Sequence, residues 1–320
     1  MARPAEVLRG KGRTIFQFSV LASGSKGNAV YIESKQARIL IDIGLGPHVL
    51  KKRLAHIHRE PQDVTALFLT HEHTDHISGA GALTKKHETP IYGTRGTREA
   101  MRRHVSPHVD WRTIGSADET VVGDLTVESF RTPHDAAESV AYVVRCGSQK
   151  LGHITDLGRI TPLIVDKLQD CDVLLVESNH DERMLENGHY PWPLKQRIQS
   201  DVGHLSNEAC ADLLAQVKHD ALKTVVLMHL SESNNHPEIA MDSARRALTV
   251  ARPSRYHALT RCRPSAPRPP GVAELGGRRE RRSPARRGTS SPYLAALQPR
   301  TPRRPFAPVR SRRGMGRKSH

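Results

Sequence analysis

The first 249 residues alternate short apolar runs with helical stretches. Apolar runs rich in Val, Ile, Leu and aromatic residues predict strands at residues 16–21, 29–33, 38–41, 66–70, 90–92, 125–130, 139–145, 150–155, 173–176 and 224–228. Helical spacing predicts helices at residues 46–58, 77–86, 94–104, 162–169, 192–199, 207–218 and 237–249. Strands that first follow one another and then interleave with helices predict an α/β layered domain with helices covering the sheets.

This pattern divides the 320-residue chain into three parts. Residues 1–14 carry charge without a following apolar run, and we expect a flexible N-terminus. Residues 15–250 carry the predicted elements and are enough for one large domain. Residues 251–320 are rich in Arg and Pro with almost no apolar periodicity, so we expect them to be a disordered tail.

The charge follows the same division. The net charge is +16, but residues 252–320 hold 18 Arg and one Lys against two Glu, and the residues before them hold 30 bases and 31 acids. The basic total therefore does not indicate that the folded domain binds nucleic acid. The tail is interpreted either as a genuine basic arm that contacts phosphates or as the product of a reading-frame shift in a GC-rich gene.

The four cysteines show no CxxC spacing, and neither a signal peptide nor an 18-residue apolar run is found. These features predict a soluble, cytoplasmic protein that works without a membrane partner.

The strand at 66–70 is followed by four side chains with metal-ligand chemistry, His71, His73, Asp75 and His76. Imidazole and carboxylate groups suit divalent first-row metals. A strand-to-helix turn would let one pair serve one ion and the other pair serve a neighbouring ion. The alternative is a solvated loop in a chain that has 19 histidines.

Three more ligand-type residues follow predicted strands: His134, Asp156 and His229. Taken singly, such residues more often cap a strand or face water. Together they have the placement that a site at the edge of a sheet requires.

The segment THEHTDHISG, residues 70–79, resembles the HxHxDH motif of the metallo-β-lactamase superfamily. The resemblance implies an αββα sandwich of two packed mixed sheets and a two-metal site whose bridging hydroxide attacks the substrate. It implies that His71, His73 and His134 hold one ion, that Asp75, His76 and His229 hold the other, and that Asp156 bridges them. It also implies that Asp42 orients the metal-binding loop. Zn²⁺ is the first expectation for both ions, with Mn²⁺ or Fe²⁺ as alternatives.

Segments spread over residues 20–247, among them LASGSKGNAVYIES and GHLSNEACADLLA, are similar to the YycJ/WalJ group, which is related to RNase Z-type nucleases. This likeness implies a phosphodiesterase with 5′ to 3′ exonuclease activity on DNA. Asp75 would orient the hydroxide, and His204 would donate a proton to the leaving oxygen. Candidates for contacting the substrate or supporting the ligands are Ser23, Ser25, Asn28 and His180.

Two other functions stay open. One is a small-molecule ester or thioester hydrolase like glyoxalase II, and the other is an inactive nucleic-acid-binding protein that uses the basic tail. Within the domain, Arg98, Arg102 and Arg103 on one predicted helix are candidates for DNA contact.

Overall fold

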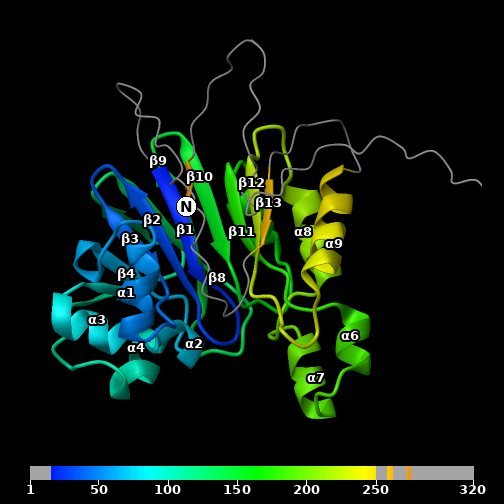
Figure 1. Cartoon of the computed structure of the whole chain (residues 1–320), viewed down its shortest axis with the longest axis horizontal. Coiled ribbons are helices and arrows are strands. Elements are labelled where there is room, and N and C mark those ends of the chain that lie inside the picture. Colours follow the sequence, from blue (N-terminus) through cyan, green and yellow to red (C-terminus); the bar gives the residue numbers. More distant parts are fainter. Residues whose placement is uncertain (1–15, 250–257, 262–271, 275–320) are drawn as a thin grey trace, which may run out of the picture.

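The computed structural model describes residues 16–249, 258–261 and 272–274, whose strands form two seven-stranded mixed sheets that pack face to face (Figure 1). The first sheet has the order β14 (Val272–Glu274), β1 (Phe16–Ala22), β2 (Ala29–Ser34), β3 (Arg38–Ile41), β4 (Ala66–Phe68), β5 (Ile91–Gly93), β6 (Trp111–Thr113). The second has the order β13 (Ala258–Arg261), β12 (Thr224–Met228), β11 (Val173–Glu177), β10 (Gln149–Ile154), β9 (Val140–Cys146), β8 (Leu125–Arg131), β7 (Glu119–Val122).

Helices cover the outer face of each sheet. On the first sheet lie α1 (Pro47–Ala55), α3 (Ala80–His87), α4 (Arg95–Ala100) and the 3-10 turns η1 (Pro61–Asp63) and η2 (Met101–Arg103). On the second lie α5 (Pro162–Leu168), α8 (Asn207–Val217) and α9 (Pro237–Thr249). Three short helices, α2 (Thr74–Ile77), α6 (Glu182–Asn187) and α7 (Trp192–Gln199), lie at one end of the sandwich (Figure 1).

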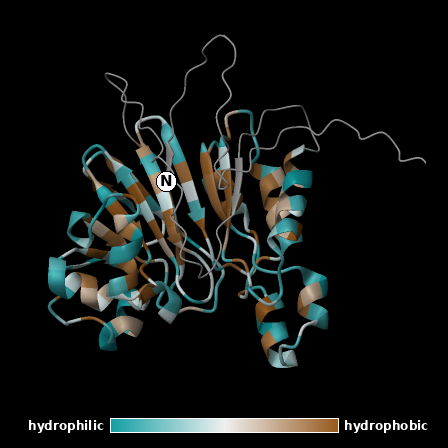
Figure 2. Cartoon of the chain, viewed as in Figure 1, coloured by the Kyte–Doolittle hydropathy of each residue, from teal (hydrophilic) through white to brown (hydrophobic). Residues whose placement is uncertain are grey.

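Three apolar clusters hold these layers together. Phe18, Phe68 and Tyr142 are buried between the sheets, and Leu54 and Leu213 are buried under the two helical layers. Strands with both faces covered are apolar throughout, while helices are mixed (Figure 2). The predicted αββα sandwich is confirmed. Among the described helices, none is long and apolar enough to cross a membrane.

Several elements differ from the sequence prediction. β6, β7 and α6 were not predicted, because they are short and show no strong periodicity. The helix predicted at 77–86 is split by Ser78 and Gly79 into α2 and α3. A side chain at Gly79 would overlap the carbonyl oxygen of Leu45, so the chain packs too closely there for any other residue.

β13 and β14 fall in the segment predicted as a disordered tail, and for these seven residues that prediction is corrected. β13 pairs in parallel with β12, and β14 pairs antiparallel with β1. Both add to the outermost strand of a sheet, where unpaired backbone groups can accept an extended segment without an apolar pattern. The rest of the tail and the N-terminus predicted as flexible lie outside the described residues.

Strand direction brings one end of both sheets together. β3 to β6 are mutually parallel, and so are β10 to β12. The carboxyl ends of such strands meet at one edge, where a doubly covered sheet binds its ligands. His71, Asp156 and His229 follow β4, β10 and β12 at this edge.

Candidate metal centre

The loop from β4 to α2 places two buried histidines side by side, His71 and His76. His71 Nδ1 lies 2.9 Å from the Thr70 hydroxyl oxygen, and His76 Nδ1 lies 2.8 Å from Asp42 Oδ2. Because both Nδ1 atoms donate to these acceptors, the Nε2 lone pairs of both rings are directed away from Asp42.

Asp42 fixes this loop from below. It is buried and has a left-handed backbone with φ of 59°. Its Oδ1 accepts the backbone N–H of Thr70 at 2.8 Å, and its Oδ2 accepts the Thr70 hydroxyl at 2.8 Å. One carboxylate therefore sets the orientation of both histidine rings, which is the kind of support that metal-binding imidazoles receive.

The second sheet contributes single residues from separate strand ends. His134 follows β8, and its Nδ1 lies 3.2 Å from the carbonyl oxygen of Gly203. His229 follows β12, and its Nδ1 lies 2.9 Å from Glu177 Oε1. Asp156 and His229 have φ values of 59° and 53°, so both turn out of their strands in the left-handed region.

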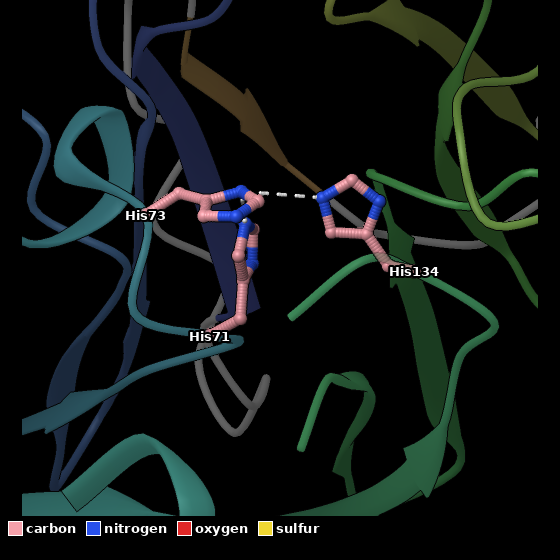
Figure 3. Close-up of side chains that lie close together, drawn as sticks. All are labelled: His71, His73 and His134. Atoms are coloured by element: carbon pink, nitrogen blue, oxygen red, sulfur yellow. Dashed lines mark hydrogen bonds between the residues drawn. The ribbon is translucent and has the colours of Figure 1, made fainter. Parts of the chain in front are cut away.

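These residues converge on the loop in two groups. In the first, His73 Nδ1 lies 3.0 Å from His71 Nε2 and 3.3 Å from His134 Nε2 (Figure 3). In the second, Asp75 Oδ2 lies 3.4 Å from His76 Nε2 and 3.7 Å from His229 Nε2.

Asp156 lies between the two groups. Its Oδ2 is 3.3 Å from His76 Nε2, and its Oδ1 is 3.9 Å from His134 Nε2. A buried carboxylate in this position is shared by both donor groups.

The donor atoms fit divalent cations. Within each group the possible ligand atoms lie within 4.8 Å of one another. Asp156 Oδ2 and His229 Nε2 are buried and form no hydrogen bond with the described residues. A buried polar atom without a partner is costly, and three imidazole nitrogens facing one point cannot all be satisfied by sharing protons. Bound cations would satisfy these atoms.

Burial and opposite charges shift the pKa values of these groups in different directions. Burial lowers the pKa of His71 well below its usual range, and the neighbouring histidines add to this. Burial opposes the charged form of His229, but the carboxylates of Asp156, Asp75 and Glu177 raise its pKa to about 10. The centre therefore combines neutral imidazoles with strongly paired carboxylates.

Glu177, at the end of β11, is a part of the site that the sequence analysis missed. Its carboxylate is fully buried and accepts hydrogen bonds from the ring Nδ1 atoms of His204 and His229 at 2.9 Å each, and from the backbone N–H groups of Leu157 and Leu205 at 3.1 Å each. Burial would raise its pKa, but His204 and His229 lower it to about 2. An acidic residue at the end of the apolar run VLLV, between two strands with ligand-type residues at their ends, could have identified it.

His204 lies at the mouth of the cluster. Its side chain is 22% exposed, whereas that of His229 is 3% exposed. Its Nδ1 is also 3.6 Å from Asp156 Oδ1. Burial would lower its pKa, but Glu177 and Asp156 raise it above its usual value.

The other predicted candidates take different places. Ser23 accepts the backbone N–H of His229 at 2.7 Å, and Asn28 lies 3.2 Å from Asp75 Oδ2 through its amide nitrogen, so both support ligand-type residues. Ser25 is exposed in the same turn. His180 is buried beside Ser206 and does not belong to any of the donor groups formed by the described residues.

A family model described as the Beta-lactamase superfamily domain matches residues 37–230. The chain belongs to the beta-lactamase superfamily. It is 39% identical over 234 residues to the exodeoxyribonuclease YycJ of Bacillus anthracis, an alignment that covers 72% of this chain and 88% of the relative. It is 36% identical over 236 residues to the exodeoxyribonuclease WalJ of Streptococcus pneumoniae, covering 70% and 85%.

Among solved structures, the metallo-β-lactamase fold protein YhfI of Bacillus subtilis superposes with a TM-score of 0.62 at 16% identity, covering 82% of this chain and all of that one. This likeness concerns the fold. The predictions of a beta-lactamase superfamily hydrolase and of a YycJ/WalJ-like sequence are confirmed.

Proposed function

We propose that this protein is a two-metal phosphodiesterase that removes nucleotides from DNA ends, with 5′ to 3′ polarity. The observation that carries the proposal is the meeting of two donor groups at Asp156, in a chain that is 39% identical to a named exodeoxyribonuclease.

In this proposal His71, His73 and His134 hold one ion, Asp75, His76 and His229 hold the other, and Asp156 bridges both. Zn²⁺ suits the mixed imidazole and carboxylate set, and Mn²⁺ or Fe²⁺ suits it as well. Two bound divalent ions would supply Lewis acidity at the phosphate and lower the pKa of bound water to about 7.

The surrounding residues support this chemistry. Asn28, 3.2 Å from Asp75 Oδ2, holds the carboxylate that would orient the attacking oxygen. Asp42 and Glu177 hold three histidine rings through their Nδ1 atoms, which keeps Nε2 available for a cation.

His204 is suited to donate the proton that the leaving oxygen requires. Its Nδ1 is held by Glu177, which leaves Nε2 for a substrate at the partly exposed mouth of the site. The alcohol that leaves a DNA phosphodiester is a poor leaving group, so protonation in the transition state accelerates its departure.

Release of mononucleotides from end-labelled DNA, with Zn²⁺ or Mn²⁺ added separately, tests the proposal. We expect metal-dependent release from the 5′ end, which stops with a chelator. A thioester such as S-lactoylglutathione is the comparison substrate. Turnover of the thioester without cleavage of DNA would contradict the proposal in favour of a glyoxalase II-like hydrolase, and metal-independent DNA binding without turnover of either would favour an inactive binding protein.

A further inference from the structure

The two helical layers differ in charge. The helices on the first sheet, α1, α3, α4 and η2, carry nine basic residues and one acidic residue: Lys51, Lys52, Arg53, Lys85, Lys86, Arg95, Arg98, Arg102, Arg103 and Glu99. The helices on the second sheet, α5, α8 and α9, carry three basic and five acidic residues: Lys167, Arg245, Arg246, Asp166, Glu208, Asp212, Glu238 and Asp242. The near-neutral domain is therefore polarised.

The basic residues nearest the metal centre lie on α4 and η2. Thr97 and Met101 are buried at helical spacing, so Arg98 and Arg102 lie on the opposite, exposed face. Glu99 pairs with Arg95 at 3.1 Å. Arg98, Arg102 and Arg103 are exposed and pair with no acidic group of the described residues, which leaves them as net positive charges.

α4 begins at the rim of the metal centre. Its Gly96 N–H donates to Glu138 Oε2 at 2.9 Å, and the Thr94 hydroxyl donates to the Glu138 carbonyl oxygen at 2.9 Å. The loop that holds Glu138 starts just after His134 and is tied to Glu72, between His71 and His73, by a 2.7 Å hydrogen bond from the Ala137 N–H. A path from the metals to Arg98 therefore crosses only this loop.

The basic face continues beyond η2. A side chain at Gly81 of α3 would overlap the His104 carbonyl oxygen, so α3 and the end of η2 pack closely. Lys85 lies one helical turn after Gly81 and is exposed. The face defined by Arg98, Arg102, Arg103 and Lys85 leads away from the site along the outside of the first sheet.

We propose that this α4–η2 face binds the phosphate backbone of the DNA that extends beyond the scissile phosphate. The inference rests on the proposed function and adds the path of the substrate. Arg98 to Arg103 spans roughly 8 Å of helix, comparable to about two to three steps of 3.4 Å along one DNA strand. Three arginine side chains at this spacing match successive phosphates and contact no base, so the face binds without reading sequence.

The test compares two triple variants of the full-length protein. Arg98→Gln/Arg102→Gln/Arg103→Gln removes the face. Lys35→Gln/Lys218→Gln/Lys223→Gln removes the same charge from the opposite end of the sandwich, where β2 and α8 end and β12 begins. DNA affinity is measured against salt concentration, and hydrolysis of DNA and of bis(p-nitrophenyl) phosphate is measured in parallel.

For the α4–η2 variant we expect the slope of log affinity against log salt to fall by about 0.9 for each phosphate that is no longer neutralised, and by up to about 2.7 for three. KM for DNA rises while kcat stays within about twofold, because the arginines bind the phosphates equally in the ground state and the transition state. Hydrolysis of the small phosphodiester reports that the metal centre is intact. The opposite-end variant keeps the slope of the unmodified protein.

An unchanged slope in the α4–η2 variant overturns the inference, and so does an equal decrease in both variants, which would reflect net charge alone. Loss of binding to phosphatidylserine vesicles with an unchanged DNA slope would assign the face to a membrane surface and also overturn it. If the unmodified protein hydrolyses bis(p-nitrophenyl) phosphate but no DNA, the proposed function itself fails. DNA cleavage with an unchanged slope contradicts only the assignment of this face.

Discussion

The two halves of the candidate metal centre are built in different ways. The loop after β4 places four ligand-type side chains within six residues, and Asp42 holds two of them from behind. The half from the second sheet takes one residue from each of several strand ends, and Glu177 links two of them. The first half depends on a local turn. The second depends on strand order, so its residues are held in place only when the whole sheet has formed.

If both halves form one site, removing a ligand from either should have the same, largest effect. His73→Ala in the loop half and His229→Ala in the sheet half should each lower DNA cleavage by about 10³-fold or more, because each forfeits several kcal/mol of transition-state stabilisation from the metals. The double variant should lose little more than either single one, since the residues act as a unit. Strictly multiplicative losses, measured on folded variants, would separate the halves into independent sites.

His204 tests the chemical role of the sheet half. His204→Gln should lower kcat for DNA by about 10²- to 10⁴-fold while the metal content stays unchanged. With bis(p-nitrophenyl) phosphate the loss should be much smaller, because p-nitrophenolate leaves without a proton donor. Equal losses on both substrates would rule out proton donation by this residue.

Glu177 tests the link within the sheet half. Glu177→Gln keeps the shape of the side chain but weakens its hold on the His204 and His229 rings, and metal affinity should fall about 10- to 100-fold. Competition with a chelating dye measures the change.

Glu128 supplies the matched control for Glu177, and the smallest effect on the site. It is also a buried carboxylate of the second sheet, but it pairs with Lys167 and with Arg145, the latter at 2.8 Å. Glu128→Gln should leave metal affinity unchanged. A parallel decrease of metal affinity in both variants would show that general destabilisation of the sheet explains the Glu177 result.

The same variant has a pH signature in stability. Burial raises the pKa of Glu128, but Lys167 and Arg145 outweigh it and lower the pKa below 4.5. A lowered pKa stabilises the folded state above the unfolded pKa, and this contribution is lost as the pH falls through the folded pKa. Glu128→Gln should therefore unfold about 1 to 3 kcal/mol more easily at pH 7, and the difference from the unmodified protein should shrink below pH 4.5. Urea unfolding at several pH values measures this, and a constant difference would contradict it.

The contrast between the halves also explains what could be predicted. The loop half was visible in the sequence because His71 to His76 are adjacent along the chain. His134, Asp156 and His229 could be proposed because each follows an apolar strand and a family motif said what to look for. Glu177 was missed, because only the order β10, β11, β12 shows that its strand lies between two others that end at the site.

Element boundaries depended on long-range packing in the same way. α2 and α3 separate at Gly79, where the chain meets the Leu45 carbonyl, a contact that no local pattern announces. β13 and β14 have little strand character of their own and are strands because β12 and β1 offer free edges.

The most direct test of a two-metal nuclease is a metal titration of protein first stripped with a chelator, with bound Zn²⁺ or Mn²⁺ and DNA cleavage measured on the same samples. The account predicts two ions per chain, cleavage that appears only as the second ion binds, and a reduced stoichiometry with loss of cleavage in His73→Ala. Saturation at a single ion, or full cleavage by the metal-free protein or by His73→Ala, would contradict it.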